Sequence, residues 1–309
     1  MLIPFNRRAI ALKIEATSGT AETLNPATDA LLLFNGSSQI DNDTAERPID
    51  SPVFGADEFL TALPRGVVQG QMELLGASTA GNASPVGAAL RAGGFAETLT
   101  ATTDAAYNLV SDSLETVTVK FWHSGILMEL VGARAQISAI GFTIGGRLVA
   151  DIRFEGPAST VTEDPLPTTV DLSAFRSPPV ANSANTTLSV NSFAVEGFST
   201  SFDPGTALQT KEHTEDIVTQ ITGRKGSFTS AFYRPAASSL DVYALKNAHT
   251  KFPINLVVDG GATLKTTVAV ANCQIEAVSH QEEQNDFAYQ INGRMLRDAA
   301  NGEMVITFD

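Results

Sequence analysis

The run Thr116-Val-Thr-Val-Lys-Phe-Trp122 alternates apolar and polar side chains, and this pattern decides the expected fold. In an extended strand successive side chains point to opposite faces, so both valines and Phe121 share one face. The run 147–155 repeats the pattern, with Ala150, Ile152 and Phe154 opposite charged neighbours. Such alternation is typical of sheets with one buried face. The sequence therefore predicts a mainly β protein.

Further strand-like runs surround this one in a definite order. Runs at 30–34 and 65–75 precede a short helix at 86–92, which Ser84-Pro85 would begin and Gly93-Gly94 would end. Four runs then follow, at 116–122, 126–131, 135–143 and 147–155. The long polar stretch 37–63 carries no regular pattern, and we expect it to be flexible.

The second part of the chain repeats this order. Strand-like runs at 188–198 and 223–233 flank a polar stretch at 198–219, a short helix is expected at 240–248, and runs follow at 252–258, 262–270, 274–280 and 286–295. The segment 157–187 is rich in proline, threonine and serine, as linkers often are. Cut at residue 160, each part holds seventeen acidic and ten basic residues. We therefore predict a duplication: β-sandwich or half-barrel domains at 1–156 and 188–309, each with one short helix, joined by a linker at 157–187.

Composition excludes several classes of protein. The 309 residues carry a net charge of −14, and the longest basic runs are the pairs Arg7-Arg8 and Arg224-Lys225. A chain without a basic stripe is a poor candidate for gripping nucleic acid. No apolar stretch of about 18 residues exists that could span a membrane. Residues 1–8 lack the order of a signal peptide, and the single Cys273 cannot form an internal disulfide, so we expect synthesis in the cytoplasm and a buried thiol.

Chemistry-bearing motifs are absent from the sequence. It contains no Gly-x-Ser-x-Gly elbow, phosphate-binding loop or dinucleotide fingerprint. The segment 41–46 superficially resembles a calcium loop, but it has Ala45 at a ligand position and Glu46 where glycine is needed. The four histidines are scattered and show no zinc-site spacing. We expect no catalytic residue, no cofactor and no metal, and hence no enzyme.

Two blocks of the first half resemble a known family. In the run 115–156 a hairpin at His123-Ser124-Gly125 and a bend at Gly132-Ala133-Arg134 lead to a return strand that ends at Gly156. This run, with the strand and helix of 65–94, is similar to the major tail tube proteins of siphophages, which have long non-contractile tails. No diagnostic motif carries the likeness, which lies in the order of elements.

The resemblance implies a function in the virion tail. Family members are helix-flanked β-sandwiches that stack as rings into a hollow tube for double-stranded DNA. Their partners are further copies of themselves and the tape measure, tail terminator and tail tip proteins, and assembly takes place in the bacterial host cytoplasm. A duplicated chain would supply six domains from three copies, as a pseudo-hexameric trimer.

Candidate site residues follow from that expectation. An acidic lumen would let DNA slide without sticking, and residues expected on the polar strand faces could line it: Asp151, Glu155 and Glu276. The two polar stretches would make contacts between rings through Asp41, Asp43, Glu46, Arg47, Asp57, Glu58, Lys211, Glu212, Glu215 and Asp216.

Two other functions stay open. One is a related tube component, such as a tail terminator or an injection-tube subunit. The other is a β-sandwich module that binds carbohydrate or a receptor, which would require clustered exposed aromatic residues. The tyrosines and the single tryptophan are scattered along the sequence, at Tyr107, Trp122, Tyr233, Tyr243 and Tyr289.

Overall fold

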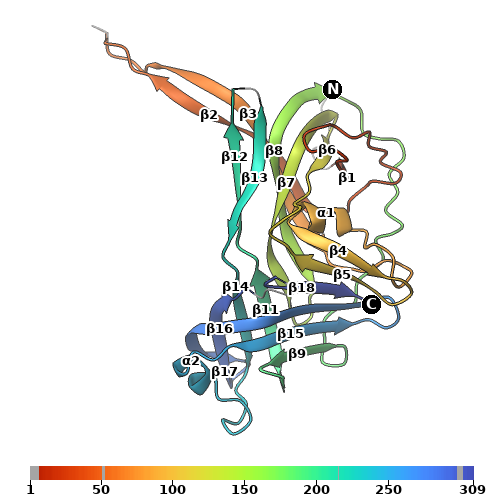
Figure 1. The fold of residues 1–309 in the computed structure, drawn as a ribbon, viewed down its shortest axis with the longest axis vertical. Coiled ribbons are helices and arrows are strands. Elements are labelled where there is room, and N and C mark those ends of the chain that lie inside the picture. The colour runs from red at the N-terminus through yellow and green to blue at the C-terminus, as the bar shows by residue number, and fades with distance from the viewer. Residues whose placement is uncertain (1–6, 51–52, 215, 298–301) are drawn as a thin grey trace.

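The structure is a computed structural model that describes residues 7–50, 53–214, 216–297 and 302–309 (Figure 1). Strands hold 56% of the residues and helices 4%, which confirms a mainly β fold with two short helices. One large antiparallel sheet contains most of the strands.

The first half of the chain forms one end of this sheet. The elements of this half are β1 (Arg8–Ile14), β2 (Phe34–Arg47), β3 (Glu58–Glu73), α1 (Gly87–Ala92), β4 (Phe95–Thr100), β5 (Asp104–Leu109), β6 (Val117–His123), β7 (Ile126–Thr143) and β8 (Val149–Glu163). In sheet order, β2 pairs with β3, β3 with β8, β8 with β7, β7 with β6, and β6 with β1.

The second half has the same strand order. Here β11 pairs with β14, β14 with β17, β17 with β16, β16 with β15, and β15 with β9. Each strand therefore has an equivalent in the first half: β2 and β11, β3 and β14, β8 and β17, β7 and β16, β6 and β15, β1 and β9. The elements are β9 (Thr186–Val190), β10 (Phe193–Val195), β11 (Gly197–Asp203), β12 (Thr206–Glu212), β13 (Ile217–Arg224), β14 (Ser227–Tyr233), α2 (Val242–Asn247), β15 (Phe252–Asp259), β16 (Lys265–Glu283), β17 (Asp286–Met295) and β18 (Val305–Phe308).

A short sequence repeat lies on the equivalent strands β2 and β11. Ser37-Ser-Gln-Ile-Asp41 on β2 corresponds to Ser199-Thr-Ser-Phe-Asp203 on β11. Both runs follow a β-bulge next to a glycine, Gly36 or Gly197. Both also lead directly into a hairpin. The shared residues and the shared surroundings support a common origin of the two halves.

The polar stretches expected to be flexible are hairpins. The outer parts of β2 and β3, residues 41–47 and 58–65, pair as a hairpin. With the described residues 48–50 and 53–57 we call it the long arm, and β12 with β13 forms a second hairpin, the short arm. Figure 1 shows the long arm projecting away from the body, while the short arm lies alongside β7 and β8. Hairpins with two polar faces show no apolar alternation, so the period-2 signal was missing from the sequence.

Some expected boundaries were wrong. The two runs at 126–131 and 135–143 belong to the single strand β7, in which Gly132 (φ 69°) accommodates a shift in register instead of a turn. Runs 262–270 and 274–280 likewise join in β16. The helix α2 begins after Asp241, whose side chain accepts hydrogen bonds from the backbone N–H of Tyr243 (3.0 Å) and Ala244 (2.9 Å). The helix therefore begins two residues later than the expected 240–248.

The segment between the halves is held in place. Its first residues continue β8 to Glu163. Beyond that strand, Arg176 Nη2 donates to the backbone oxygens of Ala77 (2.7 Å) and Thr263 (2.6 Å), which belong to different halves. The backbone of Ala181 exchanges hydrogen bonds with Gly145 and Gly146. The linker therefore fastens the two halves together.

One hydrophobic core runs through both halves. It includes Phe121 and Phe154 from the first half and Phe202 and Phe252 from the second. The C-terminal strand β18 adds to this continuity, because it pairs with β16 on one edge and with β5 on the other. Cys273 is fully buried in the core, as expected, and burial raises the pKa of its thiol.

Candidate assembly surfaces

The two halves meet where β11 pairs with the end of β7. Ser199 lies opposite Thr143, and Phe202 lies opposite Ile140, in antiparallel register. A side chain at Gly141 would place its Cβ 1.9 Å from the carbonyl oxygen of Thr200. The strands can approach this closely only because residue 141 is glycine.

The short arm of the second half covers the β7–β8 sheet of the first. Arg134 Nε on β7 donates to the backbone oxygen of Thr219 on β13 (2.9 Å). Thr210 Oγ1 on β12 donates to Glu155 Oε1 on β8 (3.0 Å). Burial lowers the pKa of the Arg134 guanidinium, opposed by the charge of Glu15. The contact therefore combines a desolvated cation with backbone acceptors, which makes it specific in geometry.

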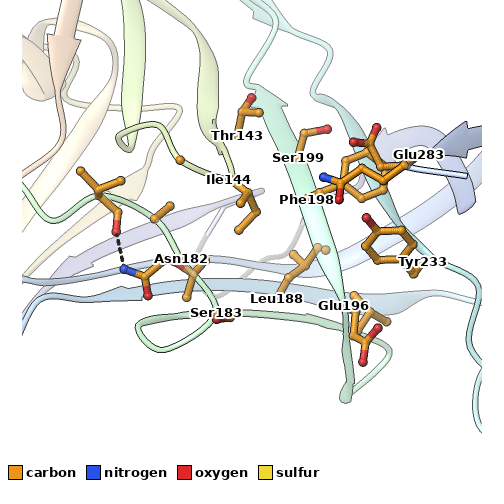
Figure 2. A pocket seen from close by; sticks show the side chains of 17 residues that line it. Thr143, Ile144, Asn182, Ser183, Leu188, Glu196, Phe198, Ser199, Tyr233 and Glu283 are labelled. Atoms are coloured by element: carbon orange, nitrogen blue, oxygen red, sulfur yellow. Dashed lines mark hydrogen bonds between the residues drawn. The ribbon is translucent and has the colours of Figure 1, made fainter. Parts of the chain in front are cut away.

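The tip of the β7–β8 hairpin contacts the start of β11. The Ile144 N–H donates to the carbonyl oxygen of Phe198 (2.9 Å). Figure 2 shows the cleft of about 950 Å³ beside this contact, with Leu188, Phe198 and Tyr233 around it. Glu283, the last residue of β16, also lines the cleft.

The strands equivalent to this junction lack such partners. Within the described ranges, β2 pairs only with β3, so its outer edge is open. The last residues of β16, from Ala277 to Glu283, pair only with β17 in the same described part of the chain. Ile140, Gly141 and Phe142 at the end of β7 are buried, whereas Ser279, His280 and Glu282 near the end of β16 are exposed. The first half therefore has an open edge at β2, whereas the equivalent strand β11 is covered by β7. The second half has an open edge at the end of β16, whereas the equivalent strand β7 is covered by β11.

The expected ring-contact residues lie on the two arms. Asp41, Asp43, Glu46 and Arg47 are on β2, and Glu58 is on β3 after Asp57. Lys211 and Glu212 are on β12, Asp216 precedes β13, and Glu215 lies outside the described residues. An exposed ion pair joins Arg47 to Glu58 across the long arm (3.4 Å). The long arm also exposes apolar residues that the polar composition had obscured: Ile49, Val53, Phe54, Phe59 and Leu60.

The three acids expected on a lumen have different surroundings. Asp151 is exposed on β8 and accepts a hydrogen bond from Gln71 Nε2 (3.0 Å). Glu155 is buried and paired with Arg153 (3.0 Å) and Arg65 (3.6 Å). Glu276 is half exposed on β16 and paired with Arg294. Of the three, only Asp151 forms no ion pair within the described residues.

The face around Asp151 is polar, and Asp151, Arg153 and Asp203 are the charged residues that line its hollow. Side chains of β3, β7 and β8 line a hollow of about 410 Å³ there, among them Gln69, Gln136, Ser138 and Arg153. Amide and hydroxyl groups therefore supply most of its polarity. The acidic surface expected from the net charge is not concentrated on this face.

An aromatic cluster at the end of β16 and β17 was missed by sequence reasoning. The ring centroids of Tyr243 and Tyr289 lie 6.0 Å apart, those of Phe287 and Tyr289 5.5 Å, and those of His280 and Phe287 4.9 Å. Phe287 is 48% exposed. These residues come from α2, β16 and β17, so their proximity required the tertiary fold. The expectation that the aromatic residues are scattered is wrong for Tyr243 and Tyr289.

The aromatic residues Trp122 and Tyr107 lie inside the protein. Trp122 is buried and its Nε1 donates to Asp164 Oδ2 at the start of the linker (2.8 Å), and Tyr107 is buried in the core. No group of three or more His, Cys, Asp or Glu side chains that could hold a metal ion occurs in the described ranges. In the same part of the chain, no helix has the length and apolar character needed to cross a membrane.

Neither a protein-family model nor a curated protein matches this chain.

Proposed function

We propose that this protein is the repeating subunit of a phage tail tube, which polymerises as stacked rings around a channel for double-stranded DNA. One observation carries the proposal: the halves share a strand order, and the second half docks on the first by edge pairing. That docking leaves an equivalent open edge at each end of the chain. Edges of this kind serve as templates for pairing with another chain.

Three copies would close such a ring. The strands β2, β3, β8, β7, β11, β14, β17 and β16 are consecutive neighbours, eight for each copy. Three copies supply roughly 24 strands, which at a spacing of about 4.8 Å give a circumference of roughly 115 Å before any tilt is included. The resulting channel would be wider than a DNA duplex. The trimer would imitate sixfold symmetry because each chain contributes two similar halves.

The charge of the protein suits a channel that does not hold DNA. The net charge is −14, and the polar face around Asp151 offers amide and hydroxyl groups without a basic stripe. Phosphate binding requires clustered lysine and arginine, since neutralised phosphates release counterions. The proposal carries the family's partners with it, namely the tape measure, tail terminator and tail tip proteins, in the virion tail after assembly in the host cytoplasm.

Negative-stain microscopy of the concentrated protein tests this proposal. We expect rings of threefold symmetry and tubes built from them, with mass photometry giving trimers or multiples of three. A protein that stays monomeric at every concentration, alone and with the other tail proteins, would rule out the tube function. A tail terminator would give single rings that do not extend.

The aromatic cluster supports a second candidate, a module that binds carbohydrate. The exposed rings of Tyr243, His280 and Phe287, on α2, β16 and β17, pack around the buried Tyr289, and sugars stack on such surfaces. Glycan-array binding that disappears in Phe287→Ala and Tyr243→Ala, from a protein that forms no rings, would favour this function over the tube.

A further inference from the structure

We infer that copies of this chain join head to tail, the open edge of β2 in one copy pairing with the last residues of β16 in the next, as β11 pairs with β7 inside each chain. The inference rests on the proposed function, because it names the surfaces by which the tube subunit binds its own copies. The occupant of both open edges is therefore a second copy.

The internal junction provides the template for this contact. β11 and β2 are equivalent strands that carry the related runs 199–203 and 37–41, and β7 and β16 are equivalent strands that each precede a hairpin. β11 fills the edge of β7 beyond the point where β6 stops. The edge of β16 beyond β15 has no such strand in the described part of the chain. The unpaired edge of β16 in one copy and the unpaired strand β2 of another copy would therefore form this contact.

Exposure of the side chains distinguishes the occupied edge from the open ones. Thr200 and Phe202 on β11 are buried, whereas their equivalents on β2, Ser38 and Ile40, are half-buried and exposed. An exposed isoleucine on an open strand edge is costly in a solitary protein. Covering β2 with a strand of the next copy would remove this exposure.

A hollow beside β2 matches the position where a hairpin tip is seated in the second half. In that half, the β7–β8 tip contacts Phe198 at the start of β11. At the start of β2, a hollow of about 400 Å³ is lined by Leu33, Asn35, Gly36 and Phe121. The tip of the β16–β17 hairpin, at Gln284 and Asn285, would occupy it in the assembled state.

The two arms also correspond between the internal junction and the proposed contact between copies. The short arm lies on the β7–β8 sheet of the preceding half, held by Arg134 and Glu155. The long arm would lie on the equivalent sheet of the next copy, formed by β16 and β17. That sheet presents Gln290 and Arg294, and the long arm presents Arg47 and Glu58 together with its apolar residues. Its exposed position in the single chain follows from the absence of that neighbour.

The template also fixes the register. Val149 on β8 and Asp286 on β17 are equivalent, because the pairings that lead to them from the related runs 37–41 and 199–203 match residue by residue. Val149 lies opposite Gly141 on β7, and Asp286 lies opposite Glu283 on β16, so Gly141 and Glu283 are equivalent. Gly141 lies opposite Ser201 in the junction, so Gln39 of one copy should lie opposite Glu283 of the next, and Ile40 opposite Glu282.

Paired cysteines test this register. The variant Gln39→Cys/Glu283→Cys should form disulfides between chains under mild oxidation, giving a closed covalent trimer on a non-reducing gel. The control Ser199→Cys/Thr143→Cys occupies opposite positions in the internal junction and should link within one chain. Mixing the single variants Gln39→Cys and Glu283→Cys should yield covalent dimers only, since each copy then has one reactive edge. The native Cys273 is buried and does not compete.

The outcomes separate this inference from the proposed function. Rings or tubes seen by microscopy, with the control pair linked and the test pair unlinked, would overturn the inference and leave the tube function standing. Covalent trimers that never stack into tubes would support the inference and count against the tube function. A protein that remains monomeric, with only the control pair linked, would overturn both.

Discussion

Ile40 and Phe202 occupy equivalent positions in the two halves, yet Phe202 is fully buried and Ile40 is 44% exposed. Phe202 lies opposite Ile140 in the junction between β11 and β7. Ile40 lies on the open edge of β2. One chain therefore contains this position twice: Phe202 is covered by β7, and Ile40 has no strand beside it on the open edge of β2.

Arginine substitutions at this pair should have opposite effects. Ile40→Arg should leave the free energy of unfolding within about 0.5 kcal/mol of the wild type, because the side chain is exposed, and should abolish ring formation. Phe202→Arg should prevent stable folding, since it buries an unpaired charge. Urea denaturation and mass photometry measure both effects. Normal rings from Ile40→Arg would contradict the assignment of β2 to the assembly surface.

Gly141→Ala should weaken the junction between the halves. The new Cβ would lie 1.9 Å from the Thr200 carbonyl oxygen, so the strands must separate. Forcing atoms into a packed site typically costs about 1–3 kcal/mol, which urea denaturation would detect. Gly223→Ala is the matched control, because nothing lies within 4 Å of its Cβ position. Equal stability of the two variants would show that β7 and β11 can separate at the junction without loss of stability.

Arg134→Ala should release the short arm. The substitution removes donors to the backbone oxygens of Thr219 (2.9 Å), Glu115 (3.2 Å) and Leu114 (3.3 Å). Losing charged hydrogen bonds from a half-buried site should destabilise the protein by about 3 kcal/mol. Hydrogen exchange should quicken in β12 and β13 first. Arg47→Ala, which breaks an exposed ion pair on the long arm, should change stability by less than about 1 kcal/mol.

Stability should fall at alkaline pH because of Cys273. Burial raises the pKa of its thiol in the folded state, so the folded protein keeps the proton while the unfolded chain loses it near the ordinary value. This contribution is complete below pH of about 8.5 and declines as the pH rises above it, by about 2 kcal/mol at pH 10. Urea denaturation of the wild type and Cys273→Ala at pH 7 and pH 10 should show a smaller loss in the variant. Parallel losses would place the pH dependence elsewhere.

Asp151→Lys should leave assembly intact and hinder the passage of DNA. Asp151 is exposed and has no cation to pair with in the described residues, so a lysine there would add repeated positive charge to the polar face. Assembled tubes of the variant should retain DNA in low salt and release it as salt rises. Asp112→Lys, in the exposed loop after β5, is the charge-matched control. Infection at wild-type efficiency by phage with the Asp151 change would contradict a lumen at this face.

The sequence predicted the fold class and the order of strands better than it predicted the surfaces. Alternation in 116–122 and 147–155 identified β6 and β8 as strands, although Thr118 and Trp122 on the second face of β6 are also buried. It could not identify the arms, whose faces are both largely polar. The run shared by β2 and β11 was available in the sequence, but five residues with two identities carry meaning only once the sheet order is known. The pairing of Glu155 with Arg65 and Arg153 depends on neighbouring strands and has no local signal.

In the proposed tube, the unequal arms would affect how one ring sits upon another. The long arm extends β2 and β3 well beyond the body, whereas the short arm is a separate hairpin folded against β7 and β8 (Figure 1). A trimer would show these two lengths in alternation around its rim. Successive layers would then interlock only at rotations of one third of a turn, so a growing filament would inherit a threefold phase that six identical domains would lack.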